Sequence, residues 1–146
     1  MSSLRFFLLS EFRDLSSRDV LRIAKNLPSQ FRWKRPREVS IAFVNLREMQ
    51  ALNNRYRGKD RPTDVLSFEG GAVASEKGSV YLGDLVLCPA YAAVEAKRRG
   101  IELQEELMRL TIHGVLHLLG FDHATKEEEL AMFGLQERWL SRAYDA

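Results

Sequence analysis

The three histidines of this chain all fall within eleven residues, at His113, His117 and His123. Because His113 and His117 are four positions apart, a helix places both imidazoles on one face, one turn above the other. Gly120 follows three residues later, where a glycine can adopt the left-handed conformation that ends a helix and turns the chain. Such a turn lets His123 fold back toward the other two. The spacing therefore predicts a metal site with three imidazole ligands.

The ligand set indicates which metal to expect. Three neutral imidazoles leave one position open on a tetrahedral Zn²⁺ ion, as in catalytic zinc sites, whereas structural sites are closed by four protein ligands. We expect one Zn²⁺ per chain, with water in the open position. Imidazole also suits nickel, copper and iron(II), so the spacing alone leaves Ni²⁺ or another divalent metal open.

Length and composition predict a single domain over residues 1–146. The chain has 45% hydrophobic residues, enough for one buried core, and no low-complexity tract or repeat interrupts it. Its single cysteine, Cys88, excludes a disulfide framework, and no apolar run approaches membrane-spanning length. We expect a cytoplasmic protein without a membrane partner.

The net charge of +2 conceals an asymmetry between the two halves of the chain. Residues 1–73 carry 14 Lys and Arg against 8 Asp and Glu, whereas residues 74–146 carry 8 against 12. In the basic half, residues 31–37 (FRWKRPR) interleave aromatic and cationic side chains, and residues 55–61 hold a second group of cations. Both stretches suit phosphate contact and base stacking on RNA. A solvated basic surface without a ligand is the alternative.

Hydrophobic periodicity and helix-capping signals predict four strands and about five helices. Because the elements do not alternate regularly, they favour an α+β fold with helices packed on a small mixed sheet. The helix that carries His113 and His117 is apolar on its other sides, so it should be the buried central helix. The expected strands span residues 4–9, 39–43, 65–68 and 80–87. The expected helices run from residue 16 or 17 to 27, from the cap at residue 45 to the glycine at 58, from residue 89 to just before the glycine at 100, from about 102 to 119, and from the cap at residue 125 to about 142.

The pattern His-x-x-x-His-x-x-Gly-x-x-His is the spacing of the metzincin peptidases, which makes a metallopeptidase one hypothesis. Those enzymes carry a glutamate directly after the first histidine, as the general base. Here that position is Gly114, which cannot accept a proton. A peptidase would need another base, such as Asp122 or Glu106, brought within reach of the metal.

The same motif, HGVLHLLGFDH at residues 113–123, resembles the signature of the YbeY family of bacterial endoribonucleases. Residues 53–68 (NNRYRGKDRPTDVLSF) and the LGD strand at residues 82–84 are similar to further hallmarks of that family. These segments occur in matching order and span most of the chain. Departures are small: Phe121 stands where many members have tyrosine, and Asp64 where many have asparagine.

The resemblance implies a single-strand-specific, metal-dependent endoribonuclease that matures ribosomal RNA, especially the 3′ end of the small-subunit RNA, and takes part in ribosome quality control. It implies that His113, His117 and His123 carry the metal, with His113 also counted as catalytic. Arg57 matches the functionally important arginine of the family. The implied partners are single-stranded ribosomal RNA, the small ribosomal subunit, ribosomal proteins and assembly GTPases, and no DNA is expected.

Elementary chemistry is consistent with this function. Zinc lowers the pKa of a bound water to about 7, so the missing glutamate matters less. The metal can alternatively polarise a phosphoryl oxygen while a 2′-hydroxyl attacks, and both routes stay open. Arg57 would offset charge on the phosphorane, with phosphate positioning or a plain surface role as alternatives. Asp60, Asp64 and Asp84 are candidates for supporting or turn positions.

A third class of function is a ribosome-assembly factor that binds RNA and protein, with zinc as a structural element and little or no cleavage of its own. Cleavage of unstructured RNA by the purified protein would distinguish the endoribonuclease from this factor.

Overall fold

The computed structural model describes residues 3–70 and 78–145, and these residues form one mixed four-stranded sheet. The strand order is β1-β2-β4-β3, with β1 and β4 parallel to β2, and β3 antiparallel to β4 at the edge. The predicted mixed sheet is confirmed. The strands are β1 (Leu4–Leu8), β2 (Arg37–Phe43), β3 (Val65–Glu69) and β4 (Val80–Leu87).

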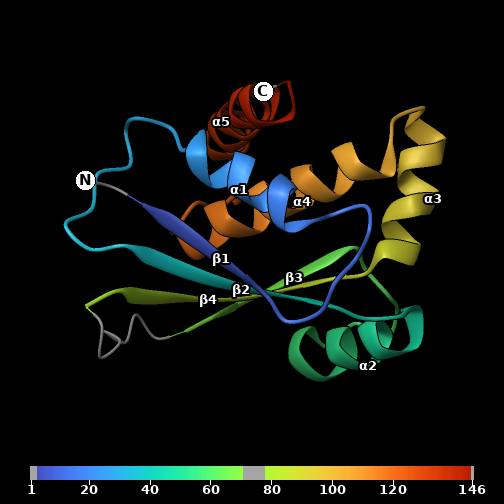
Figure 1. The fold of residues 1–146 in the computed structure, drawn as a ribbon. Helices are drawn as coiled ribbons and strands as arrows, with labels where there is room; N and C mark the ends of the chain where they lie inside the picture. Colours follow the sequence, from blue (N-terminus) through green and yellow to red (C-terminus); the bar gives the residue numbers. More distant parts are fainter. Residues whose placement is uncertain (1–2, 71–77, 146) are drawn as a thin grey trace.

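Five helices of the described residues surround this sheet (Figure 1). Four of them lie on one face, and α2 lies on the other (Figure 1). None of these helices is long and apolar enough to cross a membrane. The helices are α1 (Ser17–Lys25), α2 (Leu46–Arg57), α3 (Pro89–Arg99), α4 (Leu103–Leu118) and α5 (Lys126–Tyr144).

Local capping interactions set the ends of these helices. Asn45 and Glu48 form a reciprocal capping box at the start of α2, and Thr125 accepts a hydrogen bond from the Glu128 amide at the start of α5. The backbone of Gly58 ends α2 in the left-handed conformation, at a φ of 69°. These caps confirm the boundaries predicted from sequence.

The first helix ends earlier than predicted. We expected it to reach Leu27, but α1 ends at Lys25. The Asn26 side chain donates a hydrogen bond to the Arg22 carbonyl oxygen at 2.7 Å, which satisfies one of the free carbonyls at the helix end. A side-chain cap therefore replaces the proline stop that the sequence indicated.

The predicted buried central helix is α4, which packs between the sheet and α5. At Gly114 the helix lies directly against the sheet, because a Cβ at this position would come within 2.5 Å of a Leu85 methyl carbon. Leu85 is itself fully buried and has little room to move. The fully buried apolar residues of α4 are Leu107, Met108, Ile112, Val115 and Leu116.

The aromatic residues of the 31–37 segment pack inward. Phe31 and Trp33 stack with their ring centroids 5.8 Å apart, and Phe31 also contacts Trp139 of α5 at 6.3 Å. The Arg37 guanidinium lies 5.2 Å from the centroid of the Trp33 ring. These rings therefore anchor the segment to the hydrophobic core.

Candidate metal centre

The structure brings the three predicted ligands together. His113 and His117 lie on one face of α4, and their Nε2 atoms are 3.0 Å apart. One ligand nitrogen from each of His113, His117 and His123 lies within 4.8 Å of the others. His113 and His117 are partly buried and His123 is exposed, so the cluster reaches from the protein interior to solvent.

The turn after α4 directs His123 toward the helix. Gly120 has a φ of 99°, the left-handed conformation that the sequence predicted. Its amide donates to the His117 carbonyl oxygen at 3.0 Å, and the Phe121 amide donates to the Leu116 carbonyl oxygen at 3.0 Å. This pair of bonds is the Schellman motif, which ends a helix and reverses the chain.

Hydrogen bonds orient the two helical imidazoles. The Nδ1 of His113 lies 2.7 Å from Oε1 of Gln136, and the Nδ1 of His117 lies 3.1 Å from the Phe121 carbonyl oxygen. Because these oxygens can only accept, each Nδ1 donates and each Nε2 carries its lone pair. Histidines that bind metals through one nitrogen donate from the other in this way.

Electrostatics favour the neutral form that a metal ligand requires. Burial lowers the pKa of His113 below its ordinary value. Burial also lowers the pKa of His117, and the neighbouring His113 lowers it further. Two lone pairs 3.0 Å apart repel each other, and a bound cation relieves that repulsion.

The donor set fits a divalent ion. Tetrahedral zinc with bonds of about 2.0–2.1 Å to nitrogen places its ligand atoms about 3.3 Å apart, close to the observed separation of the His113 and His117 nitrogens. Within the described residues, no carboxylate or thiol joins this three-histidine group. Imidazole nitrogen is a common ligand of zinc and of other divalent transition metals.

Arg57, at the end of α2, shares a pocket of about 440 Å³ with His113 and His117. Its Nη2 donates to the Ser67 carbonyl oxygen at 2.9 Å, and its guanidinium lies 5.8 Å from the Phe68 ring centroid. The edge strand β3 therefore holds the arginine in the same pocket as two of the candidate ligands, although the arginine and these histidines lie far apart in the sequence.

Gly114 explains why this helix carries no glutamate after its first histidine. The position faces Leu85 and the Ser67 hydroxyl, and a side chain there would collide with the sheet. Of the two other bases that a peptidase could use, Glu106 is buried in ion pairs with arginines and does not line the pocket. Asp122 does line it, and its Oδ1 accepts the His123 amide at 2.7 Å.

None of the three candidate aspartates is among the residues that line the pocket. Asp60 accepts a hydrogen bond from the Gln50 side chain at 3.0 Å, in the loop after α2. Asp84 accepts a hydrogen bond from the Tyr81 hydroxyl. It is two residues from Val86 of β4, which packs in the hydrophobic cluster beside α2, so it shares the sheet face opposite α4.

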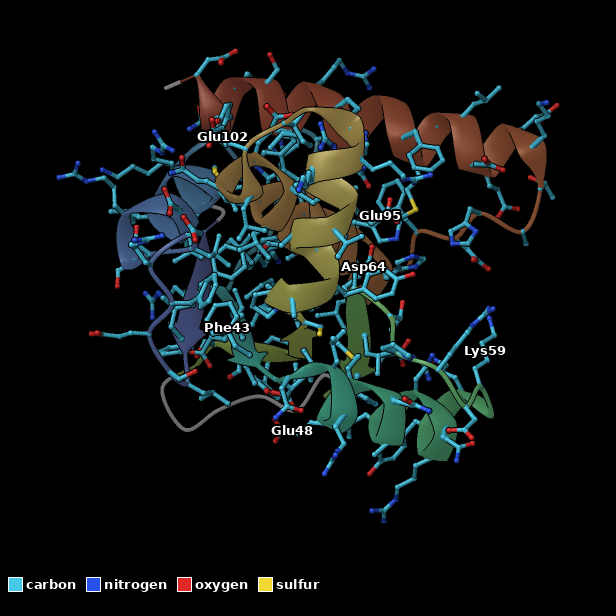
Figure 2. The ribbon with its side chains drawn as sticks, turned by 90° about the vertical axis from the view of Figure 1, so that its right-hand side faces the viewer. Phe43, Glu48, Lys59, Asp64, Glu95 and Glu102 are labelled. Atoms are coloured by element: carbon cyan, nitrogen blue, oxygen red, sulfur yellow. The ribbon has the colours of Figure 1, made fainter. Side chains whose placement is uncertain are left out.

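Asp64 lies closer to the centre. It stands at the start of β3, and its carbonyl oxygen accepts the Cys88 amide at 2.9 Å next to α3 (Figure 2). Burial raises the pKa of its carboxyl group, and hydrogen bonds from the backbone amides of Val65 and Asp64 lower it in part. The carboxyl group also interacts electrostatically with His113, so Asp64 belongs to the surroundings of that histidine.

Sequence reasoning missed Gln136, the hydrogen-bond partner of His113. Gln136 is 3% exposed and lies on the apolar stripe of α5 beside Leu135 and Trp139. A polar residue at a core position of an amphipathic helix was the available signal, because buried polar groups need partners.

Fold and site together define a class of protein: an α+β protein with a three-histidine cluster that could hold a metal ion, and with an arginine in the pocket that two of these histidines line. A family model described as endoribonuclease YbeY matches residues 10–144 of this chain. The chain belongs to the YbeY endoribonuclease family.

Individual relatives agree with the family model. Endoribonuclease YbeY of Nocardia farcinica is 41% identical over 140 residues, which cover 91% of this chain and 76% of that protein. Endoribonuclease YbeY of Salinispora tropica is 41% identical over 138 residues, which cover 88% of each chain. The solution structure of a Thermotoga maritima protein matches with a TM-score of 0.61 at 25% identity, covering 99% of this chain and 90% of that one.

These findings confirm the family expected from sequence. Membership fits a metal-dependent endoribonuclease in ribosomal RNA processing. It favours neither the metallopeptidase nor the non-catalytic assembly factor.

Proposed function

We propose that this protein cleaves single-stranded RNA with a Zn²⁺ ion bound by His113, His117 and His123, and that Arg57 acts on the scissile phosphate. One observation carries the proposal: two of the three clustered histidines line the pocket that also holds Arg57. His113 is both ligand and catalytic residue, since its position determines where the ion meets the substrate.

The histidines and the zinc ion have different roles in the proposed reaction. His113 and His117 present neutral Nε2 atoms toward each other, as their hydrogen bonds at Nδ1 require. A bound zinc ion supplies Lewis-acid polarisation of a phosphoryl oxygen or a water molecule.

Arg57 is suited to the charge that develops on the phosphate. Its contacts with the Ser67 carbonyl oxygen and the Phe68 ring hold the guanidinium in place before substrate arrives. The other N–H groups of its side chain remain for phosphoryl oxygens, and charge-assisted bonds of this kind are the stronger ones. A fixed cation stabilises developing charge without reorganisation.

The shape of the site supports a single-stranded substrate. His113 and His117 are partly buried, so a phosphate must enter a hollow to reach them. A flexible strand can do this more readily than a rigid duplex, and RNA recognition is concentrated on such unpaired segments. Lys59 points outward from the loop after α2, where it can contact the incoming strand (Figure 2).

The finer assignments rest on family membership. We propose that the RNA is ribosomal, that the 3′ end of the small-subunit RNA is a target, and that the small subunit, ribosomal proteins and assembly GTPases are partners. Such a role takes place in the cytoplasm.

A nuclease assay combined with elemental analysis tests the proposal. The purified protein should contain one zinc per chain and cut an unstructured RNA. His113→Ala should abolish cutting and metal binding while the circular dichroism spectrum is kept. Lys126→Gln, which changes a charge outside the pocket, is the control and should cut normally.

Three results would contradict parts of this function. Undiminished cutting by His113→Ala would reject the metal-dependent mechanism. X-ray absorption that reveals a sulfur ligand, or full metal content in the double variant His117→Ala/His123→Ala, would reject the ligand set.

A further inference from the structure

Gln136 of α5 makes a hydrogen bond at each end of its side-chain amide. Its side chain is buried, and its Oε1 lies 2.7 Å from Nδ1 of His113. At the other end of the same amide, Nε2 donates to Oε2 of Glu137 at 3.1 Å. One side chain therefore connects a metal ligand with a carboxylate.

Arg109 of α4 fixes that carboxylate. Its Nε and Nη2 donate to the two oxygens of Glu137 at 3.0 and 3.2 Å. The same guanidinium also binds Glu105 and Glu106, and the Arg109 side chain is only 12% exposed. A buried, multiply bonded arginine is a rigid anchor, because its planar fork loses little freedom for each bond.

The chain of contacts determines which way the Gln136 amide points. A carboxylate only accepts hydrogen bonds, so the NH₂ end must face Glu137 and the oxygen must face His113. The His113 Nδ1 must then carry the proton. Its Nε2 is left with a lone pair, directed at the cluster shared with His117.

We propose that Gln136 and Glu137 are positioning residues that set the orientation and tautomer of His113 for metal binding, with Arg109 as their anchor. The inference rests on the proposed function, because it concerns the same metal centre. It assigns a role to a network that spans α4 and α5 and touches neither the substrate nor the ion.

His117 provides an internal comparison. Its Nδ1 is held by a backbone carbonyl in the turn after α4, which no single side-chain substitution removes. His113 depends on a side chain instead. Substitution of Gln136 should therefore disturb one ligand and leave the other in place.

The decisive measurement is zinc affinity of the metal-free protein, by competition with a chelator. Gln136→Met keeps the size and burial of the side chain and removes both polar ends. Loss of such a supporting partner typically weakens metal binding about 10–100-fold, and we expect a change in that range. Gln104→Met is the matched control: Gln104 bonds Asp19 at 2.7 Å near the start of α4, and its loss should leave zinc affinity unchanged.

A double variant that exchanges Gln136 and Glu137 should restore zinc affinity. The double variant Gln136→Glu/Glu137→Gln keeps an acceptor oxygen beside His113 and another beside Arg109, with the same total charge. We expect its zinc affinity to lie much closer to the wild type than to Gln136→Met. If Gln136→Met fails to fold, Glu137→Ala serves instead, because 49% of the Glu137 side chain is exposed; its affinity should also fall.

Nitrogen NMR of the metal-free protein reports the tautomer directly. The wild type should have the proton of His113 on Nδ1, and Gln136→Met should lose that preference. A proton on Nε2 in the wild type, or wild-type zinc affinity in Gln136→Met and Glu137→Ala, would overturn the inference. A wild type with the expected tautomer but no zinc affinity would refute the proposed metal centre instead.

Discussion

Two basic stretches look alike in the sequence and differ in the structure. Residues 31–37 combine four cations with two aromatic residues, and residues 55–61 combine four cations with one, Tyr56. In the first stretch, Phe31 and Trp33 pack against the core, and the Arg37 guanidinium donates to the Arg35 carbonyl oxygen at 2.9 Å. In the second stretch, Arg57 lines the metal pocket.

The difference lies in what each stretch contributes to the site. The first stretch packs against a residue that orients the site. The rings of Phe31 and Phe121 are 6.0 Å apart, and the Phe121 carbonyl oxygen bonds Nδ1 of His117. The second one places a cation, Arg57, in the pocket that His113 and His117 line. Charge and aromatic content alone therefore do not distinguish the two stretches, whereas the residues that line the pocket do.

The largest expected effect is on catalysis. Arg57→Ala should lower the rate of RNA cleavage by about 10²–10³, the scale for loss of one transition-state donor in acyl transfer. RNA binding should change far less, because this guanidinium acts mainly on charge that grows in the transition state. Metal content should not change. Single-turnover cleavage at saturating protein separates rate from affinity, and a normal rate with weaker binding would make Arg57 a phosphate-positioning residue.

The second effect is on stability. Phe31→Ala should lower the free energy of unfolding by about 3 kcal/mol, because it removes a ring packed between Trp33, Phe121 and Trp139. Tyr56→Ala, in the other stretch, should lower it by about 1 kcal/mol, since 49% of this residue is exposed. Urea unfolding monitored by circular dichroism measures both. Equal losses would remove the contrast between the two stretches.

The smallest effect is on RNA affinity. Removing charge in Arg35→Gln/Arg37→Gln should weaken RNA binding and reduce the slope of log affinity against log salt by about 0.7 for each phosphate that is no longer neutralised. Lys126→Gln/Arg142→Gln, which removes the same charge from the acidic half, should have no such effect. Binding titrations at several salt concentrations test this pair, and equal losses would mean that the charge asymmetry is irrelevant.

Much of the candidate metal centre was predictable because its geometry is local. The i, i+4 spacing of His113 and His117 fixes their common face on any helix, and a glycine after the helix permits the left-handed turn toward His123. The capping boxes likewise involve residues only three positions apart. Neighbours along the chain dominate all of these features, so the residue types suffice to predict them.

Contacts between distant segments were decided only by tertiary structure. Gln136 bonds His113 across 23 positions of sequence. Arg57 lies in the pocket because it bonds the Ser67 carbonyl oxygen of β3, and β3 is placed there by its pairing with β4. Asp84 follows the same pattern: its strand was predicted, but strand register and packing place it on the face away from α4. The sequence by itself determined the cluster of three histidines, the turn, and the helix that carries two of them. The packing of α5 and β3 against α4 decided that Gln136 orients His113 and that Arg57 lies in the same pocket. These contacts join residues far apart in the sequence, so they depend on how whole elements pack.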